Sequence, residues 1–147
     1  DNLHIVAEGP VCAIAQDEDT LAGMDDWNQE HHGRSGLIER VRASQVTEQE
    51  AAQITLNFLR KHLDAGTSPL CGNSIGQDRM FLRRYMPVLN DFFHYRNIDV
   101  SSVKELARRW NPDILEKTNK DSQHIALEDI KDSIIELRSY KRYFFIT

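Results

Sequence analysis

The chain has 147 residues, enough for one ordinary domain with a hydrophobic core and too few for two. Hydrophobic residues make up 40% of it and charged residues 28%, which is typical of a folded globular protein rather than a disordered one. The formal net charge of -5 argues against a protein that holds long nucleic acid by bulk electrostatics, although a short oligonucleotide can still bind in a local pocket.

The cysteines and the apolar segments indicate where the protein works. Cys12 and Cys71 each lie in an apolar run, so we expect buried thiols, no disulfide framework and a reducing compartment. No apolar stretch approaches the roughly 20 residues that a membrane helix needs, and the first residues lack the pattern of a signal peptide. These features predict a cytoplasmic protein with no membrane partner.

The first third of the chain predicts strands followed by helices. Residues 3–7 and 10–15 have the pattern of two short strands, because a Gly-Pro pair, which is typical of turns, separates them. Residues 17–32 have a weak helical pattern. Residues 35–44 predict a second helix, with Ser35 as its candidate N-cap.

Residues 47–66 carry the clearest helical pattern. Thr47 and Glu50 have the spacing of a capping box at its start, and Gly66 is a typical helix end. The apolar stripe of this helix predicts three residues that face a core, which are Ile54, Phe58 and Leu59.

The rest of the chain alternates between strands and helices. In order, the predicted elements are a strand at 68–72, a helix at 75–93 that is re-angled at Pro87, a strand at 96–102, a helix at 101–110 with Ser102 and Glu105 as a capping box, and a closing helix at 124–145. Strands separated by helices of this length predict an α/β protein with a mixed sheet flanked by helices.

Asp78 stands in the first turn of the helix predicted at 75–93. At about 100° per residue it lies about 40° from Leu82, inside a stripe of apolar side chains that should face the core. A buried carboxylate is costly unless it is paired, hydrogen-bonded or bound to a metal. The alternative, which the position alone favours, is that Asp78 only stabilises the positive end of the helix dipole.

The closing helix carries a histidine and an aspartate that can reach a cleft. Its apolar face is predicted from Ile130, Ile134 and Leu137, and Asp129 borders that face. His124 stands at the helix start, where its side chain can enter a neighbouring pocket. The five-residue spacing does not place both on one helix face as a metal pair, and a surface histidine beside a solvated aspartate is the simpler alternative.

Two further groups suggest contacts with nucleic acid. Trp27 and the pair His31-His32 lie in a polar segment and can stack on a base, although a packed tryptophan beside solvated imidazoles is the simpler explanation. A candidate phosphate-binding set, for which the alternative is a strand with a capped helix behind it, consists of Tyr95, Arg96, Ser101 and Ser102.

Several stretches taken together resemble oligoribonuclease, the family of DEDD-type 3′-to-5′ exoribonucleases. They are GNSIGQDRMFLRRYMP at 72–87, HYRNIDVSSVKELARRW at 94–110 and HIALEDIKDSIIEL at 124–137, preceded by MDDWNQEHHGRSGLIERV at 24–41. The resemblance runs through the whole chain. It implies a ribonuclease H-like exonuclease fold that forms a single domain over residues 1–147.

The resemblance also implies a catalytic site. Asp78 matches the carboxylate of the second exonuclease motif, Asp129 the metal-binding carboxylate of the third, and His124 the general base of that motif. Two Mg²⁺ or Mn²⁺ ions would clamp the scissile phosphate, and hard divalent ions prefer carboxylate oxygens. A histidine can take the proton of the attacking water near neutral pH.

The remaining implied roles concern the substrate, which is single-stranded RNA of two to five nucleotides. Trp27 and His32 match residues that line the nucleotide site, and Ser74 matches a contact to the terminal phosphate of the substrate. In the family's homodimer, a segment reaches the partner's active site and caps the 5′ phosphate, and its matches here are Tyr95, Arg96, Ser101 and Ser102.

One family feature is absent from the 147 residues, namely the Asp-x-Glu of the first motif on an N-terminal strand. We therefore expect a fold truncated at the N-terminus, with an exposed sheet edge, weak metal binding and little or no turnover by this chain alone. A catalytically silent module for dimerisation or RNA-end binding is the first alternative. A related DEDD nuclease for longer RNA or DNA is the second, and the acidic net charge argues against it.

Overall fold

The computed structural model describes residues 2–118 and 126–145. The chain forms two compact units, which we call the small unit (residues 9–62) and the large unit (residues 1–8 and 63–147). Both units contain buried apolar side chains, such as Leu56 in the small unit and Val100 in the large unit. The prediction that residues 1–147 form a single exonuclease domain stays a prediction.

The small unit is helical in its described residues. Its helices are α1 (Glu18–Ala22), α2 (Asp26–Arg34), α3 (Leu37–Ala43) and α4 (Glu48–Leu59). The predicted capping box is confirmed, because Thr47 Oγ accepts from the N–H of Glu50 and the Glu50 carboxylate accepts from the N–H of Thr47.

Three details of the small unit differ from the prediction. Ser35 caps the end of α2, and α3 follows Gly36, whose φ of 70° lies in the left-handed region that glycine adopts without strain. α4 ends at Leu59, well before Gly66. Ile54 is 42% exposed, and the side chains of α4 that are buried are Ala51, Ala52 and Leu56.

The capping box makes the stability of the small unit depend on acid. Hydrogen bonds from Thr47 hold the pKa of Glu50 below its ordinary value of 4.5, so this stabilisation is present above that pH and is lost as pH falls through the lowered pKa. We expect Glu50→Gln to lower the melting temperature more at pH 6 than at pH 3. Thermal unfolding of both proteins at the two pH values measures this, and an equal difference at both would contradict it.

The large unit contains both strands. Its elements are β1 (Leu70–Gly72), α5 (Ile75–Tyr85), α6 (Pro87–Phe92), β2 (Asn97–Asp99), α7 (Val100–Trp110), the 3₁₀ helix η1 (Pro112–Thr118) and α8 (Ala126–Tyr143). None of the helices in the described parts of the chain is long and apolar enough to cross a bilayer.

The sheet of the large unit consists, in residues 2–118 and 126–145, of two parallel strands. Leu70 lies opposite Asn97, Cys71 opposite Ile98 and Gly72 opposite Asp99. Helices α5 and α6 form the connection that parallel strands require. The mixed sheet predicted from the sequence is therefore not what these residues form, although the two strands predicted at 68–72 and 96–102 are confirmed.

The strands predicted at 3–7 and 10–15 are wrong for this structure. Residues 2–16 have no regular secondary structure, and Val6 and Val11 are 85% and 68% exposed. A strand exists only where a neighbouring strand pairs with its N–H and C=O groups, and no strand of the described chain is hydrogen-bonded in a sheet to these segments. Alternation of apolar residues cannot supply that partner.

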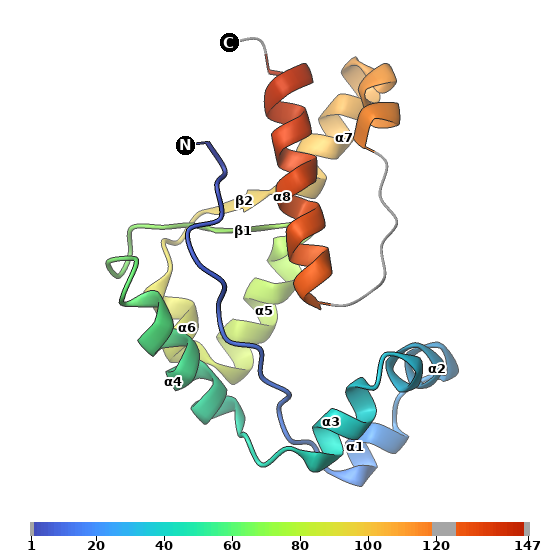
Figure 1. Cartoon of the computed structure of the whole chain (residues 1–147), viewed down its shortest axis with the longest axis vertical. Coiled ribbons are helices and arrows are strands. Elements are labelled where there is room, and N and C mark those ends of the chain that lie inside the picture. Colours follow the sequence, from blue (N-terminus) through green and yellow to red (C-terminus); the bar gives the residue numbers. More distant parts are fainter. Residues whose placement is uncertain (1, 119–125, 146–147) are drawn as a thin grey trace. The chain divides into compact units, whose positions relative to one another are not determined.

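The core of the large unit lies where α7, η1 and α8 pack together (Figure 1). Its fully buried side chains are Val100, Ala107, Ile114 and Tyr140. Partly buried apolar side chains surround them, namely Val103, Leu115, Leu137 and Phe144. This cluster holds α8 against α7 at the side of the sheet where β2 ends and α7 begins.

Two features place α5 relative to the sheet. The predicted break at Pro87 is confirmed, because α5 ends at Tyr85 and proline occupies the first position of α6, where its missing N–H costs nothing. Arg79 is only 8% exposed, and its guanidinium donates to the carbonyl oxygen of His94 and to Asn97 Oδ1 at 2.8 and 3.3 Å. These bonds tie α5 to the start of β2.

The start of α7 is capped differently from the prediction. Asp99, the last residue of β2, is the N-cap, and its carboxylate accepts from the N–H of Ser101 at 3.0 Å. The capping box predicted from Ser102 and Glu105 is therefore wrong. Glu105 instead pairs with arginines later in the helix, and the hydrogen bond from Arg109 holds the pKa of this glutamate below its ordinary value.

Candidate active site

The candidate site is built on the turn between β1 and α5. After Gly72 the chain passes through Asn73 and Ser74, and Ser74 adopts a left-handed conformation with φ 52°. Such a conformation is unfavourable for a residue other than glycine and needs support from its surroundings. The N–H of Ser74 supplies it by donating to Asp99 Oδ1 at 3.0 Å and to Ser101 Oγ at 2.9 Å.

This turn brings together two of the predicted phosphate-binding residues. The hydroxyl oxygens of Ser74 and Ser101 lie 3.3 Å apart in the same chain. They meet because the parallel register places the carboxyl ends of both strands at one edge of the sheet, and each strand is followed at once by a helix. The N-termini of α5 and α7 therefore begin side by side, and the Asp99 carboxylate accepts from the N–H groups of both Ser74 and Ser101.

The other predicted phosphate-binding residues flank this pair. Ser102 is exposed, and together with Ser101 it helps to line a cavity of about 460 Å³ over the start of α7. Tyr95 and Arg96 precede β2 and are both exposed, and the guanidinium carbon of Arg96 lies 5.3 Å from the centre of the Tyr95 ring. Both side chains are thus accessible on the surface of the large unit.

The orientation predicted for Asp78 is wrong. Its side chain is exposed, whereas Ile75 and Arg79, on either side of it, are the buried positions of α5. The inward position is taken by the arginine because its guanidinium finds two acceptors there. Asp78 stands in the first turn of α5, so the helix dipole stabilises it, and its role as a metal ligand stays a prediction.

Asp129 is half-buried in the first turn of α8. Its helix is fastened to the turn that starts α5, because Asn73 Nδ2 donates to Ser133 Oγ at 2.9 Å and to Glu136 Oε2 at 3.0 Å. Ser133 Oγ in turn donates to the carbonyl oxygen of Asp129 at 2.8 Å. The helices that carry Asp78 and Asp129 thus both anchor at the β1–α5 turn.

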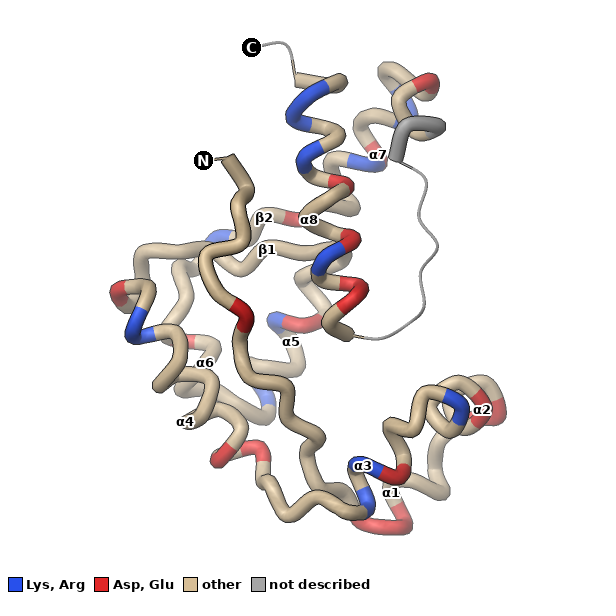
Figure 2. The backbone as a smooth tube through the Cα atoms, in the orientation of Figure 1, with Lys and Arg blue, Asp and Glu red and all other residues tan. Residues whose placement is uncertain are grey.

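The charges of α8 are divided along the helix. Acidic residues concentrate in its first half and basic residues near its end, as Figure 2 shows. The acidic residues of the first half are Glu128, Asp129 and Asp132, with Lys131 among them paired to Glu128, and the basic residues near the end are Arg138, Lys141 and Arg142. This order complements the helix dipole.

His124 falls in residues 119–125, outside the described residues, so its predicted role as a general base stays a prediction. Within residues 2–118 and 126–145, no three histidine, cysteine, aspartate or glutamate side chains form a group that could hold a metal. The donors that are present, two carboxylates at Asp78 and Asp129, are nevertheless of the type that Mg²⁺ and Mn²⁺ prefer. The chemistry of this donor pair therefore fits the implied metals.

The predicted nucleotide-binding residues of the small unit lie on α2. Trp27 is 53% exposed, so the alternative of a packed tryptophan is wrong. One face of its indole ring stacks on His31, with ring centres 4.1 Å apart and an interplanar angle of 18°. His32, the next residue, is half-buried. The helix spacing thus pairs Trp27 with His31, four residues later, rather than with His32.

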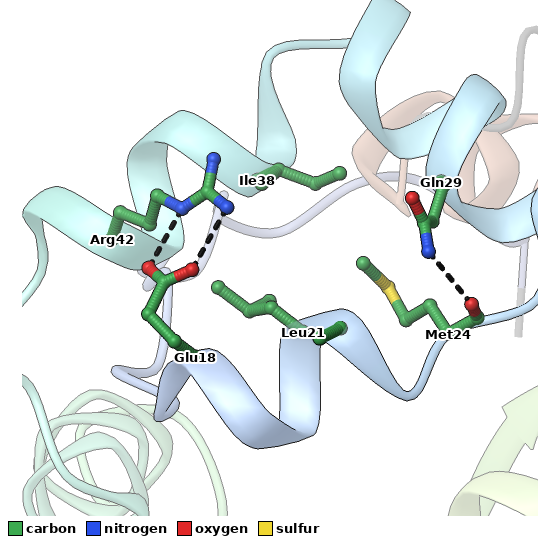
Figure 3. Close-up of a pocket in the computed structure, with 7 residues that line it drawn as sticks. Glu18, Leu21, Met24, Gln29, Ile38 and Arg42 are labelled. Atoms are coloured by element: carbon green, nitrogen blue, oxygen red, sulfur yellow. Dashed lines mark hydrogen bonds and ion pairs between the residues drawn. The ribbon is translucent and has the colours of Figure 1, made fainter.

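A second cavity, of about 350 Å³, lies in the small unit (Figure 3). Arg42 donates to both carboxylate oxygens of Glu18 at 2.8 and 2.9 Å, and Gln29 donates to the carbonyl oxygen of Met24. The hydrogen bonds from Arg42 hold the pKa of Glu18 below its ordinary value. None of the predicted site residues lines this cavity, and its charged groups satisfy each other.

The predicted burial of the cysteine thiols is wrong for Cys71. This residue is exposed in β1, and Cys12 is half-buried. Partial burial and, to a smaller extent, the carboxylate of Asp99 raise the pKa of the Cys71 thiol. Cys71 faces outward because side chains alternate along a strand, and its neighbours Leu70 and Gly72 take the less exposed positions.

The motifs of the sequence do not single out Glu136, which is 1% exposed. The apolar stripe predicts a core position for Ile130, although Ile130 is 58% exposed. A spacing of four, three and four residues puts a single stripe of α8 toward the rest of the large unit, and its members are Asp129, Ser133, Glu136 and Tyr140. This regular spacing of polar residues along a long helix is the signal that could have revealed the buried glutamate.

Comparison with known proteins identifies the family. The model of the RNase T exonuclease family matches residues 1–137. An oligoribonuclease from Shewanella loihica is 64% identical over 143 residues, which cover 97% of this chain and 79% of that protein. An oligoribonuclease from Marinobacter nauticus is 62% identical, with the same coverage of both chains.

A more distant relative gives the same result. An oligoribonuclease from Acinetobacter baylyi is 56% identical over 146 residues, which cover 99% of this chain and 80% of that protein. The identity is far above the level at which a family assignment is in question, and it extends over nearly every residue. The chain belongs to the oligoribonuclease family of exonucleases.

Proposed function

We propose that this chain is a metal-dependent 3′-to-5′ exoribonuclease that degrades RNA of two to five nucleotides to mononucleotides. The observation that carries the proposal is the meeting of Ser74 and Ser101 at the N-termini of α5 and α7. Serine hydroxyl groups gathered at two helix starts suit a terminal phosphate, while the N–H groups of Ser74 and Ser101 donate to the carboxylate of Asp99. A site that holds the phosphate end of its substrate selects for short RNA.

The cap over the 5′ phosphate combines residues from both subunits of a homodimer. Ser74 and Ser101 touch within one chain, so we assign both to the same phosphate site. The accessible Tyr95 and Arg96 then reach the site of a partner subunit in a homodimer, and Ser102 lines the edge of the cavity beside α7. An arginine and a tyrosine supply the charge and the stacking surface that a nucleotide end requires.

The chemical step requires divalent ions, Mg²⁺ or Mn²⁺, two to each site. Asp78 and Asp129 would hold them through carboxylate oxygens. When bound, such ions stabilise the charge that develops on the scissile phosphate and activate water. His124 would accept the proton of the attacking water, which suits a side chain whose ordinary pKa is near neutrality.

The base of the substrate would stack in the small unit. Trp27 keeps about half of its surface exposed, and His31 supports one face of the indole ring. A tryptophan braced in this way loses little freedom when a base stacks on its other side. His32 follows on the same helix and would contribute a hydrogen bond or a second stacking surface to the nucleotide.

Release of mononucleotides from pGpG tests the proposed function. We expect the chain with Mg²⁺ or Mn²⁺ to convert the dinucleotide to GMP slowly, because the carboxylates of the Asp-x-Glu motif are absent from the 147 residues, and excess EDTA to stop the reaction. A longer single-stranded RNA of mixed sequence should be degraded much more slowly at equal concentration. Binding of pGpG without any metal-dependent release would contradict the proposal and favour a silent RNA-end-binding module, and equal rates on both substrates would contradict the proposed selection for short RNA.

A further inference from the structure

Glu136 is the most deeply buried charged side chain among residues 2–115 and 126–145, with 1% of its surface exposed. It lies on α8, two turns after Asp129 and one turn before Tyr140. A carboxylate withdrawn from water is strongly destabilising unless both oxygens are paired or hydrogen-bonded. A leucine would fill this position without the cost of burying a charge. The buried carboxylate therefore indicates a function other than packing.

Three elements of the large unit meet at this carboxylate. Tyr140 donates its hydroxyl to Glu136 Oε1 at 2.8 Å, and Lys104 Nζ, on α7, lies 3.6 Å from the same oxygen. Asn73 Nδ2, in the β1–α5 turn, donates to Oε2 at 3.0 Å. The two oxygens thus serve different parts of the molecule, because Oε1 faces the helices and Oε2 faces the turn that precedes Ser74.

The bond to Oε2 determines how the amide of Asn73 is turned. Because a carboxylate oxygen accepts hydrogen bonds, Glu136 takes the amide NH₂ group and leaves the amide oxygen on the opposite side. Ser133 Oγ also accepts from this NH₂ group, at 2.9 Å. The amide oxygen then accepts from Ser101 Oγ at 3.0 Å, so the single hydroxyl proton of Ser101 is directed toward Asn73.

The direction of the bond from Ser101 determines what Ser74 can do. Ser101 Oγ has no second proton to donate, and it accepts from the N–H of Ser74 at 2.9 Å. The two serine hydroxyls are 3.3 Å apart, and the proton between them must belong to Ser74. Ser74 is exposed, so its hydroxyl proton can turn from Ser101 to a ligand.

We propose that Glu136 is a positioning residue for phosphate binding. Through Asn73 and Ser101 it sets the direction of a chain of hydrogen bonds, which leaves the Ser74 hydroxyl as the donor to the terminal phosphate of the substrate. Without this acceptor the Asn73 amide is held less firmly, and the Ser101 proton competes with that of Ser74. The inference rests on the proposed function, which assigns the phosphate to Ser74.

Glu136→Leu tests this role, because it removes the acceptor of Asn73; it also removes the acceptor of the buried Tyr140 hydroxyl, so the melting temperature of the variant is expected to fall. The full chain is titrated in EDTA, which prevents turnover, with pGpG and with GpG, which lacks the 5′ phosphate. The ratio of the two dissociation constants is the preference for the phosphate. We expect Glu136→Leu to lower this preference about tenfold, the effect of one charge-assisted hydrogen bond, and to leave GpG binding unchanged.

Two matched variants separate positioning from a general effect on structure. Glu136→Gln keeps an oxygen that can accept from Asn73, with its NH₂ group turned to the Tyr140 oxygen, and should retain the preference. Tyr140→Phe removes only the donor to Oε1 and should also retain it, although its melting temperature falls. If Glu136→Leu does not fold, Asn73→Ala, which cuts the chain at its next member, is expected to show the same loss of preference.

The outcomes distinguish this inference from the proposed function. If Ser74→Ala leaves the preference for pGpG unchanged, the phosphate does not bind at Ser74 and the substrate assignment itself fails. If Ser74→Ala abolishes the preference while Glu136→Leu and Asn73→Ala keep it, the positioning role of Glu136 is overturned. Equal weakening of pGpG and GpG by Glu136→Leu would also overturn it, because a merely structural residue has that effect.

Discussion

Asp129→Ala is expected to slow the release of GMP from pGpG by about a hundredfold or more, because loss of a metal ligand removes several kcal/mol of charge stabilisation from the transition state. The Asp129 side chain is half-buried, and its helix, α8, is hydrogen-bonded through Ser133 to Asn73 in the turn before α5. The rate is measured at several Mg²⁺ and Mn²⁺ concentrations. The affinity of the chain for Mn²⁺, measured by titration without substrate, should fall in parallel.

Asp132→Ala is the matched control. Asp132 stands three residues later on α8, is also half-buried and belongs to the same acidic half of the helix, so its loss changes the local charge equally. We expect its GMP release and Mn²⁺ affinity to stay within about threefold of the unaltered chain, the size of a screened surface effect. Equal effects of the two substitutions would contradict a specific role for Asp129 as a ligand.

Leu56→Ala is expected to destabilise the small unit by about 2–5 kcal/mol, because Leu56 is 1% exposed and its removal leaves a cavity as well as losing buried apolar surface. Ile54 lies two residues away on the same helix and is 42% exposed. Ile54→Ala should therefore cost less than about 1 kcal/mol. The pair removes aliphatic side chains of equal size from the two faces of α4.

Chemical denaturation followed by circular dichroism measures both free energies of unfolding, and in a Trp110→Phe background tryptophan fluorescence reports on the small unit through Trp27. Leu56→Ala should cost more stability than Ile54→Ala both at neutral pH and at low salt, because neither substitution changes a charge. A larger cost for Ile54→Ala than for Leu56→Ala would show that the stripe predicted from the sequence, and not the burial in this structure, describes the core.

Local sequence signals predicted the helices well because helix starts and breaks depend on residues that are neighbours in the chain. The capping box of Thr47 and Glu50 and the break at Pro87 are confirmed for this reason. Which face of a helix is buried depends on distant segments. The apolar stripes predicted on α4 and α8 therefore placed Ile54 and Ile130 in the core. In the structure both side chains are exposed.

The candidate site shows the same division. The motifs of the sequence resemble those of the family and so identified Ser74 and Ser101 individually. The comparisons confirm the family that these motifs indicate. Their contact depends on the parallel register of β1 and β2, which residue types in a single chain do not specify. Asp78 is the opposite case. Helix geometry predicted that it lies in the buried apolar stripe, but in the structure the guanidinium of Arg79 occupies the inward position.

By itself, the amino-acid sequence determined the family, the order of strands and α-helices from residue 68 onward, and the residues that deserve mutation. The tertiary structure alone decided that residues 3–7 and 10–15 lack a strand partner, that Asp99 caps α7, and that a carboxylate at position 136 is buried beneath the β1–α5 turn. The physical reason is that pairing and burial are properties of segments far apart in the chain, whereas capping boxes and motifs are complete within a few consecutive residues.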